Sequence, residues 1–166
     1  MKNPPIDENS LCEYIMENQT RFYRYALRYT RNSHDAQDVL SEAVYRALKA
    51  IRSLKDMNAV RPWFYKILTR CALDHIRKHP SYDELGDYLE SKFGNSDDEV
   101  IDLSDAISSL EDPYRTIVIL RFFEDMKLNE IAQTLDMNLS TVKSRLYAAL
   151  KILRLDLELA PAIFAE

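Results

Sequence analysis

Residues 128–150 read LNEIAQTLDMNLSTVKSRLYAAL, and this stretch decides the fold of the C-terminal part of the chain. Apolar residues recur at three-to-four spacing on both sides of a polar break, which predicts a short helix ending at Leu135 and a longer one beginning near Ser140. The turn between them is Asp136–Leu139, where Asp136 stands at a position that needs a left-handed backbone. The pattern predicts a helix-turn-helix.

The longer helix of this motif has two faces. Val142 and Leu146 are expected to face Ile131 and Leu135, which leaves a polar outer face toward its N-terminus. A helix of this kind fits the major groove of DNA and reads base edges with its N-terminal residues. The alternative is a helical hairpin whose polar face is only hydrated. The expected contacts to duplex DNA are Ser140, Thr141, Lys143, Ser144, Arg145, Tyr147 and Lys151.

Helical spacing also runs outward from this motif in both directions. It predicts an all-α fold, because no segment alternates as a strand does. The expected helices cover about 10–31, 33–51 and 62–78, then 103–110 and 113–123, with Ser10 and Asn32 or Ser33 as N-caps and Pro62 and Pro113 in first turns.

The net charge of −5 is distributed unevenly along the chain. Residues 1–78 carry 14 Lys and Arg against 9 Asp and Glu, residues 79–102 carry 1 against 8, and residues 103–166 carry 7 against 10. This distribution of charge predicts two small helical domains, 1–78 and 103–166, joined by a flexible acidic linker, 79–102. The C-terminal domain should bind phosphate weakly by itself and act tethered to a second DNA-binding surface.

Composition excludes several classes of protein. With 2 Gly and 6 Pro in 166 residues, the chain fits neither a β-sandwich nor a glycine-rich phosphate loop. It has no apolar stretch of membrane-spanning length and no signal-peptide core, and its two cysteines, Cys12 and Cys71, form no paired motif, so we expect a cytoplasmic protein. Cys71, His75 and His79 have metal-ligand spacing but lack an evident fourth ligand, so we expect no metal, no cofactor and no catalytic residue.

The segment Arg61–Lys66, with Arg70, Arg77 and Lys78 behind it, interleaves cations with aromatic rings along one helix. Cations follow a phosphate backbone while exposed rings stack on unpaired bases, which predicts a surface for single-stranded nucleic acid. We expect Trp63 in the core and at least one of Phe64 and Tyr65 exposed.

Three segments together resemble a known family, the extracytoplasmic-function (ECF) group of bacterial RNA polymerase sigma factors. DAQDVLSEAVYRAL (35–48) is similar to its polymerase-binding segment, and RPWFYKILTRCALDHIRK (61–78) is similar to its −10 promoter segment. LEDPYRTIVILRFFEDMKLNEIAQTLDMNLSTVKSRLYAALKIL (110–153) resembles its −35 segment. FYKIL and RFFEDMKLNEIA look most like the V-type envelope-stress factors of Gram-positive bacteria.

The resemblance implies partners and a role for each segment. The β′ clamp helices of core RNA polymerase would dock on Asp35, Asp38, Ser41, Glu42, Tyr45 and Arg46. The non-template strand of the −10 element would lie on the loop 53–60 and the helix after it, with Asn58, Arg61, Phe64, Tyr65, Lys66, Arg70, Arg77 and Lys78 as contacts. An anti-sigma factor, often membrane-anchored, would control the protein and hold it at the inner face of the membrane.

The chain departs from the family pattern at four positions. Ser41 stands where Gln is frequent, Arg70 where Asn is common, Ala148 where Arg is common, and Asp136 where the turn usually has Gly. These departures leave the promoter sequence open. Two other interpretations also stay open, namely a dimeric helix-turn-helix regulator that binds operators and a nucleic-acid enzyme that depends on acids such as Asp35 or Asp38.

Overall fold

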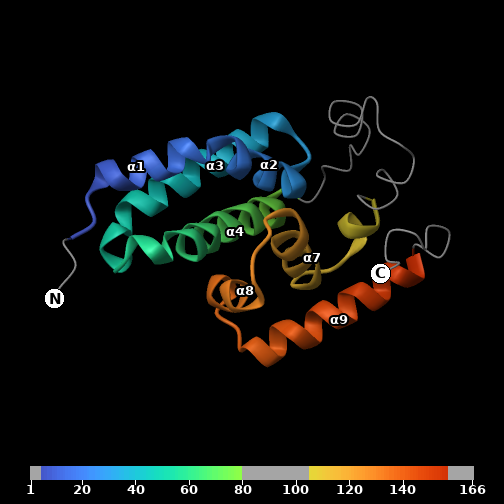
Figure 1. Ribbon diagram of the computed structural model, residues 1–166. Coiled ribbons are helices and arrows are strands. Elements are labelled where there is room, and N and C mark those ends of the chain that lie inside the picture. The colour runs from blue at the N-terminus through green and yellow to red at the C-terminus, as the bar shows by residue number, and fades with distance from the viewer. Residues whose placement is uncertain (1–4, 80–104, 157–166) are drawn as a thin grey trace. The chain divides into compact units, whose positions relative to one another are not determined.

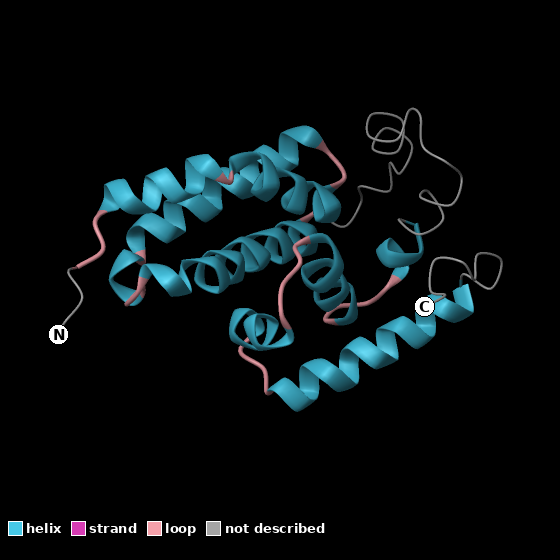
Figure 2. Cartoon of the chain, in the orientation of Figure 1, coloured by secondary structure: helices cyan, strands magenta, loops and turns pink. Residues whose placement is uncertain are grey.

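The structure is a computed structural model that describes residues 5–79 and 105–156 (Figure 1). The chain divides into two compact units, Met1–Tyr88 and Leu89–Glu166. Every regular element in the described ranges is helical, as the cyan ribbons of Figure 2 show. The predicted all-α, two-domain fold is therefore confirmed, whereas most of the predicted linker lies outside the described residues.

The described part of the first unit is built on four helices, α1 (Glu8–Glu17), α2 (Gln19–Thr30), α3 (Ser33–Lys49) and α4 (Val60–Lys78). Two single 3-10 turns, η1 (Ile51–Ser53) and η2 (Met57–Ala59), connect α3 to α4. Helices α2, α3 and α4 pack on one another pairwise, and α1 packs on α3. Helices α3 and α4 are therefore neighbours in one helical bundle (Figure 1).

The N-terminal segment forms two helices where the spacing predicted one. The prediction of Ser10 as N-cap is wrong, because Asp7 caps α1 by accepting a hydrogen bond from the Ser10 amide at 2.9 Å. Asn18 separates α1 from α2, and its side-chain amide donates to the Tyr14 carbonyl at 2.8 Å. Such a side-chain bond competes with the helical ladder and favours a break. Asn32 caps α3 as expected, accepting from the Asp35 amide at 3.0 Å.

Aromatic rings fill the core of the first unit. The Phe22 ring lies 4.5 Å from that of Phe64 and 5.3 Å from that of Tyr65, whose ring is 5.2 Å from Tyr25. Phe64 is 0% exposed and Tyr65 1% exposed, so the expectation that one of them faces solvent is wrong. The two rings are on the helix face that packs against α2, where tilted and edge-on aromatic contacts stabilise the core.

The second unit has a helical turn over 105–109, then α7 (Tyr114–Val118), η3 (Ile119–Phe123), α8 (Leu128–Leu135) and α9 (Leu139–Asp156). The segment η3 is a π-helix, so the single helix expected over 113–123 changes from α-helical to π-helical hydrogen bonding at Ile119. Helix α9 packs on α7 and on α8. The most deeply buried large side chains in the core of this unit are Ile117, Ile119, Leu120, Met126, Ile131 and Leu153.

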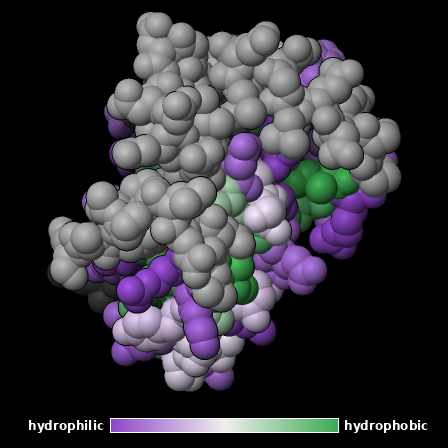
Figure 3. Space-filling view, turned by 90° about the vertical axis from the view of Figure 1, so that its right-hand side faces the viewer, coloured by the Kyte–Doolittle hydropathy of each residue, from purple (hydrophilic) through white to green (hydrophobic). Residues whose placement is uncertain are grey.

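Polar side chains cover much of the outside of these helices. In the space-filling view of Figure 3, most of the visible described surface is purple or pale, with smaller areas of green. Among the described residues, no helix is both long enough and apolar enough to cross a membrane.

Candidate nucleic-acid and protein interfaces

The helix-turn-helix has the geometry that its sequence predicts. Helix α8 ends at Leu135, and Asp136 adopts the left-handed conformation with φ 53° and ψ 45°. The Met137 amide then donates to the Ala132 carbonyl at 2.9 Å, which closes the end of α8. Helix α9 begins at Leu139, one residue before the predicted start.

The two faces of α9 separate as expected. Val142, Leu146, Ala149 and Leu153 are buried against the rest of the unit. The predicted DNA contacts lie on the other side, where Tyr147 is 71% exposed. Of that set, Ser140, Lys143, Ser144, Tyr147 and Lys151 are exposed, and Thr141 and Arg145 are half-buried.

Two of these side chains make contacts of their own. The Arg145 guanidinium donates from Nη1 to the sulfur of Met137 at 3.3 Å, which holds it close to the turn. The Ser144 hydroxyl donates to the Ser140 carbonyl at 3.0 Å within the helix, so its oxygen keeps acceptor capacity for an outside donor. The N-terminal half of α9 therefore presents cations, hydroxyls and one tyrosine together.

The loop between α3 and α4 is held by a tryptophan. The indole Nε1 of Trp63 donates to the Ser53 hydroxyl at 2.9 Å, and that hydroxyl donates to the Ala50 carbonyl at 2.6 Å. Asp56 caps η2 by accepting from the Asn58 amide at 3.0 Å. Trp63 is half-buried, so it is not the full core residue that the sequence predicts. Of the three consecutive rings it is the one whose face remains partly accessible.

The predicted single-strand contacts fall into two groups. Asn58, Arg70, Arg77 and Lys78 are exposed, and Arg61 and Lys66 are half-buried. Phe64 and Tyr65 lie in the core and are not available for base stacking. For Phe64 the sequence carries a signal, because Val60, Phe64, Leu68 and Ala72 recur at every fourth position and form one buried stripe of α4. Tyr65 lies outside that stripe and is buried by its packing against Phe22 and Tyr25.

Helix α3 carries the predicted docking residues. Asp38, Ser41, Glu42 and Tyr45 are exposed, and Arg46 is half-buried. Asp35 differs from the others because it is buried in the first turn of α3, and its Oδ2 lies 3.5 Å from Nε2 of His75 on α4. Five of the six predicted residues thus share the accessible side of α3, and the sixth lies between α3 and α4.

An open cleft of about 570 Å³ lies between α3 and α4. Asp35, Asp38, Glu42 and Arg46 of the docking set take part in its walls. Its lining residues are His34, Asp35, Asp38, Val39, Glu42, Arg46, Cys71, Asp74, His75, Lys78 and His79. The cleft joins the helix with the predicted polymerase contacts to the helix with the predicted −10 contacts.

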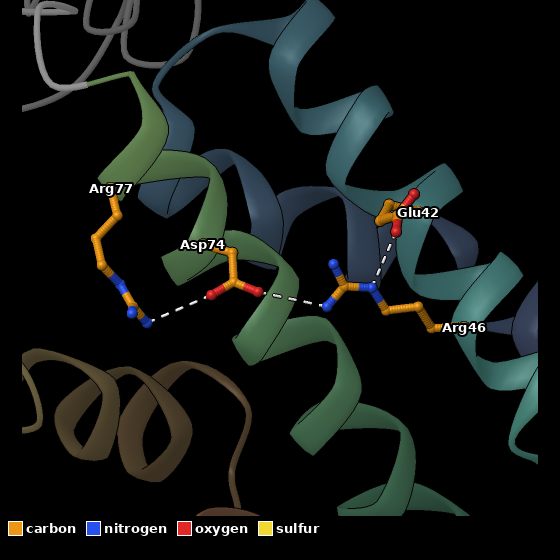
Figure 4. Close-up of polar contacts among 4 residues, drawn as sticks. All are labelled: Glu42, Arg46, Asp74 and Arg77. Carbon is orange, nitrogen blue, oxygen red and sulfur yellow. Dashed lines mark hydrogen bonds and ion pairs between the residues drawn. The ribbon is translucent and has the colours of Figure 1, made fainter.

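Ion pairs cross this cleft in a chain of four side chains (Figure 4). The Arg46 Nε lies 2.9 Å from Glu42 Oε1, and its Nη1 lies 3.4 Å from Asp74 Oδ2. The other oxygen of Asp74 lies 3.4 Å from Nη2 of Arg77. The hydrogen bond to Glu42 raises the pKa of Arg46 above its ordinary value, with a smaller contribution from Asp74.

The cysteine and histidines of the cleft are held by local contacts. Burial raises the pKa of the Cys71 thiol to about 11, with a smaller opposing effect from Arg46. The His75 and His79 rings stack at 4.5 Å, and Nδ1 of His79 lies 3.1 Å from the His75 carbonyl oxygen. Within residues 5–79 and 105–156, no group of three or more His, Cys, Asp or Glu side chains could hold a metal ion.

Three residues that are accessible or join two helices are not among the predicted site residues. Phe122 is 57% exposed and Phe123 38% exposed on η3, where adjacent helical positions point in different directions and both escape the core. Asp74 joins two helices across 28 residues of sequence, which no local pattern reveals.

Family models match both units. The model of Sigma-70 region 2 matches residues 14–81, and that of Sigma-70 region 4 matches residues 101–153. The chain belongs to the sigma-70 family of RNA polymerase sigma factors, whose members are initiation factors and not enzymes.

Within that family the chain is an ECF sigma factor, as the sequence motifs predict. It is 39% identical over 161 residues to RNA polymerase sigma factor SigV of Bacillus subtilis (strain 168), covering 95% of this chain and 96% of SigV. It is 27% identical over 172 residues to the ECF sigma factor SigW of the same organism, covering 89% of each.

Solved structures show the same fold at low sequence identity. CnrH in complex with the cytosolic domain of CnrY matches with a TM-score of 0.69 and 15% identity, over 92% of this chain and 90% of that one. The sigma factor RpoE of Bartonella quintana, in complex with the anti-sigma factor NepR, matches with a TM-score of 0.69 and 16% identity, over 90% and 97%.

Proposed function

We propose that this chain is an alternative sigma factor that binds core RNA polymerase, directs it to promoters with −35 and −10 elements, and assists melting of the −10 region. The observation that carries this proposal is the pairing of two helical units in one chain, each matched by a sigma-70 region. Polymerase synthesises the RNA, and this chain supplies recognition.

The −35 element is read by α9. Its accessible N-terminal half offers Ser140, Lys143, Ser144 and Tyr147, supported by the left-handed turn that sets the angle of α9 to α8. Helix-turn-helix proteins place this part of the second helix in the major groove. Lys143 and Arg145 supply positive charge there, while Thr141 and Lys151 border the same face.

The −10 element binds as a single strand to α4 and the loop before it. Exposed Arg70, Arg77 and Lys78 follow the phosphates, with Arg61, Lys66 and Asn58 nearer the loop. Trp63 provides the aromatic surface, since its ring is partly accessible and its Nε1 is fixed to Ser53. Capture of extruded bases offsets the cost of unstacking them, so melting needs no nucleotide hydrolysis.

Core polymerase docks on α3 through the β′ clamp helices. The accessible Asp38, Ser41, Glu42, Tyr45 and Arg46 form the contact face, which is acidic with one cation at its edge. Buried Asp35 supports this face from below by pairing with His75.

An anti-sigma factor controls the chain in this proposal. Support comes from the RpoE fold relative, whose solved structure contains the anti-sigma factor NepR. We expect the chain to act in the cytoplasm, held at the inner face of the membrane by a membrane-anchored inhibitor until envelope stress releases it. Co-purification of the chain with a membrane fraction from unstressed cells, and its loss from that fraction under stress, tests this expectation.

One experiment tests the main proposal against its rivals. Purified chain is added to core polymerase with genomic DNA, and the transcripts made in vitro are sequenced. New start sites that share −35 and −10 sequences support a sigma factor. Binding to a palindromic duplex without any change of start sites would instead identify an operator-binding regulator, and a modified nucleic acid would identify an enzyme.

A further inference from the structure

We propose that Asp74 is a positioning residue of the docking face, which holds the Arg46 guanidinium where core polymerase meets α3. Asp74 lies on α4, outside the set of residues that the docking segment supplies. The inference rests on the proposed function, because it concerns how α3 binds polymerase.

The geometry fixes the Arg46 guanidinium at two points. Glu42, one turn earlier on α3, receives its Nε at 2.9 Å, and Asp74 receives its Nη1 at 3.4 Å from the neighbouring helix (Figure 4). The two contacts use Nε and Nη1, which lie on different edges of a planar group with five N–H donors. The orientation is set before polymerase arrives, and N–H donors beyond these two bonds remain for an acceptor on the partner.

Preorganisation of this kind matters for an arginine more than for a short side chain. An arginine loses much rotamer freedom when it is fixed, and binding is weakened by that loss unless the free protein has already ordered the group. Arg46 is 40% exposed at the rim of the cleft, so without Asp74 the guanidinium would be tethered by Glu42 alone. The raised pKa of Arg46, caused first by Glu42 and also by Asp74, agrees with a guanidinium held by two carboxylates.

The second oxygen of Asp74 contacts Arg77 of the predicted −10 set at 3.4 Å. Arg77 is 76% exposed and lies three residues further along the same helix, a pairing that solvent weakens. Asp74 is therefore anchored by Arg46 across the helices, while its contact with Arg77 exchanges readily with a phosphate.

The test measures the affinity of the full chain for core polymerase. Asp74→Asn keeps the shape of the side chain and removes its charge. We expect the affinity to fall ~3- to 10-fold, in the lower part of the range for coupling between contacting residues, because solvent reaches both side chains. Arg46→Gln should lose a similar factor, and the double variant should be no weaker than Arg46→Gln alone. Asp74→Glu should restore most of the affinity. Glu17→Gln, which removes one charge from exposed α1 of the same unit, is the matched control.

A second measurement separates positioning from a structural role. The Arg46 Nε–H signal in ¹H–¹⁵N NMR spectra of the chain should broaden or move toward the free-arginine position in Asp74→Asn. The same loss of affinity should occur in an Arg77→Gln background, because the effect acts through Arg46. Asp74→Asn with unchanged affinity, or a loss in the double variant equal to the product of the two single losses, would overturn the proposal. If the wild-type chain itself fails to bind core polymerase, the proposed function fails instead.

Discussion

At Asp136 the backbone turns with φ 53°, a conformation that costs a residue with a Cβ about 1–2 kcal/mol unless its side chain suits it. Asp tolerates this region better than most residues, which is why the turn forms without a glycine. The angle between α8 and α9 therefore depends on one residue that a β-branched side chain cannot replace.

Two variants that both lose the carboxylate isolate this effect. We expect Asp136→Val to be less stable than Asp136→Gly by about 1–2 kcal/mol, because only valine has a Cβ that clashes in the left-handed region. Urea unfolding followed by amide signals of the second unit measures the difference. Equal stabilities would mean that the turn adapts to its residue.

Trp63 differs from its neighbours because its ring is the accessible one. We expect Trp63→Ala to impair promoter opening by the loss of a base stack, about 1–3 kcal/mol. Trp63→Phe, which keeps a ring but loses the Nε1 donor to Ser53, should retain most of the opening. The measurement is the fluorescence of 2-aminopurine placed in the −10 element. Full opening by the alanine variant would exclude a stacking role.

Cys71 is buried in the wall of the cleft, which shields its thiol from solvent and reagents. Its pKa is raised to about 11 because burial disfavours the charged thiolate, so the thiol stays protonated up to pH values near 11. Since the thiolate is the reactive form, iodoacetamide at pH 8 should modify half-buried Cys12 first and reach Cys71 only when the chain unfolds. Peptide mass spectrometry of the native and urea-treated protein distinguishes the two sites, and equal rates in the native protein would contradict burial.

At the scale of elements, α9 separates its functions by face. Removing the charge of Lys143 should weaken use of −35-dependent promoters by about 1–3 kcal/mol, the range for a single specific base contact, without changing affinity for core polymerase. Arg154→Ala, near the other end of the same helix, is the matched control because it removes a cation from exposed surface outside the predicted set. In vitro transcription from promoters with altered −35 bases measures the effect. An equal loss in both variants would indicate only general attraction.

Helices with one clear apolar stripe were predictable. The helix-turn-helix followed from local spacing and its left-handed residue from the residue type of Asp136. Asn32 was one of the two residues predicted to cap α3. The break at Asn18 and the π-helical η3 did not, because each depends on hydrogen bonds that compete with a regular helix. Phe64 and Tyr65 were misassigned because composition favoured exposed rings, whereas packing against α2 decides the face.

The binding sites were predictable only in part. The accessible residues of α9 follow from helical periodicity, whereas those of α3 were predicted from the family resemblance. Asp74 could not be found in this way, since its partner Arg46 lies 28 residues earlier on another helix. Contacts of that kind are set by tertiary structure.

At the scale of the whole molecule, the charge is divided between parts. The stretch 1–78 carries a net +5 and the stretch 103–166 a net −3, so the two regions differ in their attraction to phosphate. The region with the weaker attraction to phosphate, 103–166, depends on the region 1–78 through the chain that connects them. The connection turns the second binding event into an intramolecular one.

Cutting that connection should therefore weaken promoter binding although both units remain. With a protease site introduced between the units, cleavage of the holoenzyme should lower the contribution of the −35 element by ~10²- to 10⁴-fold. Mobility-shift titrations before and after cleavage, on promoters with and without the −35 element, measure this. The chain without the introduced site, incubated with the same protease, is the control, and binding that survives cleavage would show that each unit suffices.

The hydrogen bond between Trp63 and Ser53 has a practical consequence, because the sequence contains 1 tryptophan. Ultraviolet emission excited at the red edge of indole absorption comes from this ring alone in the isolated chain. The wavelength and intensity of this emission thus report on a single loop, without any added dye. In the free protein they should change when a ligand binds at the start of α4.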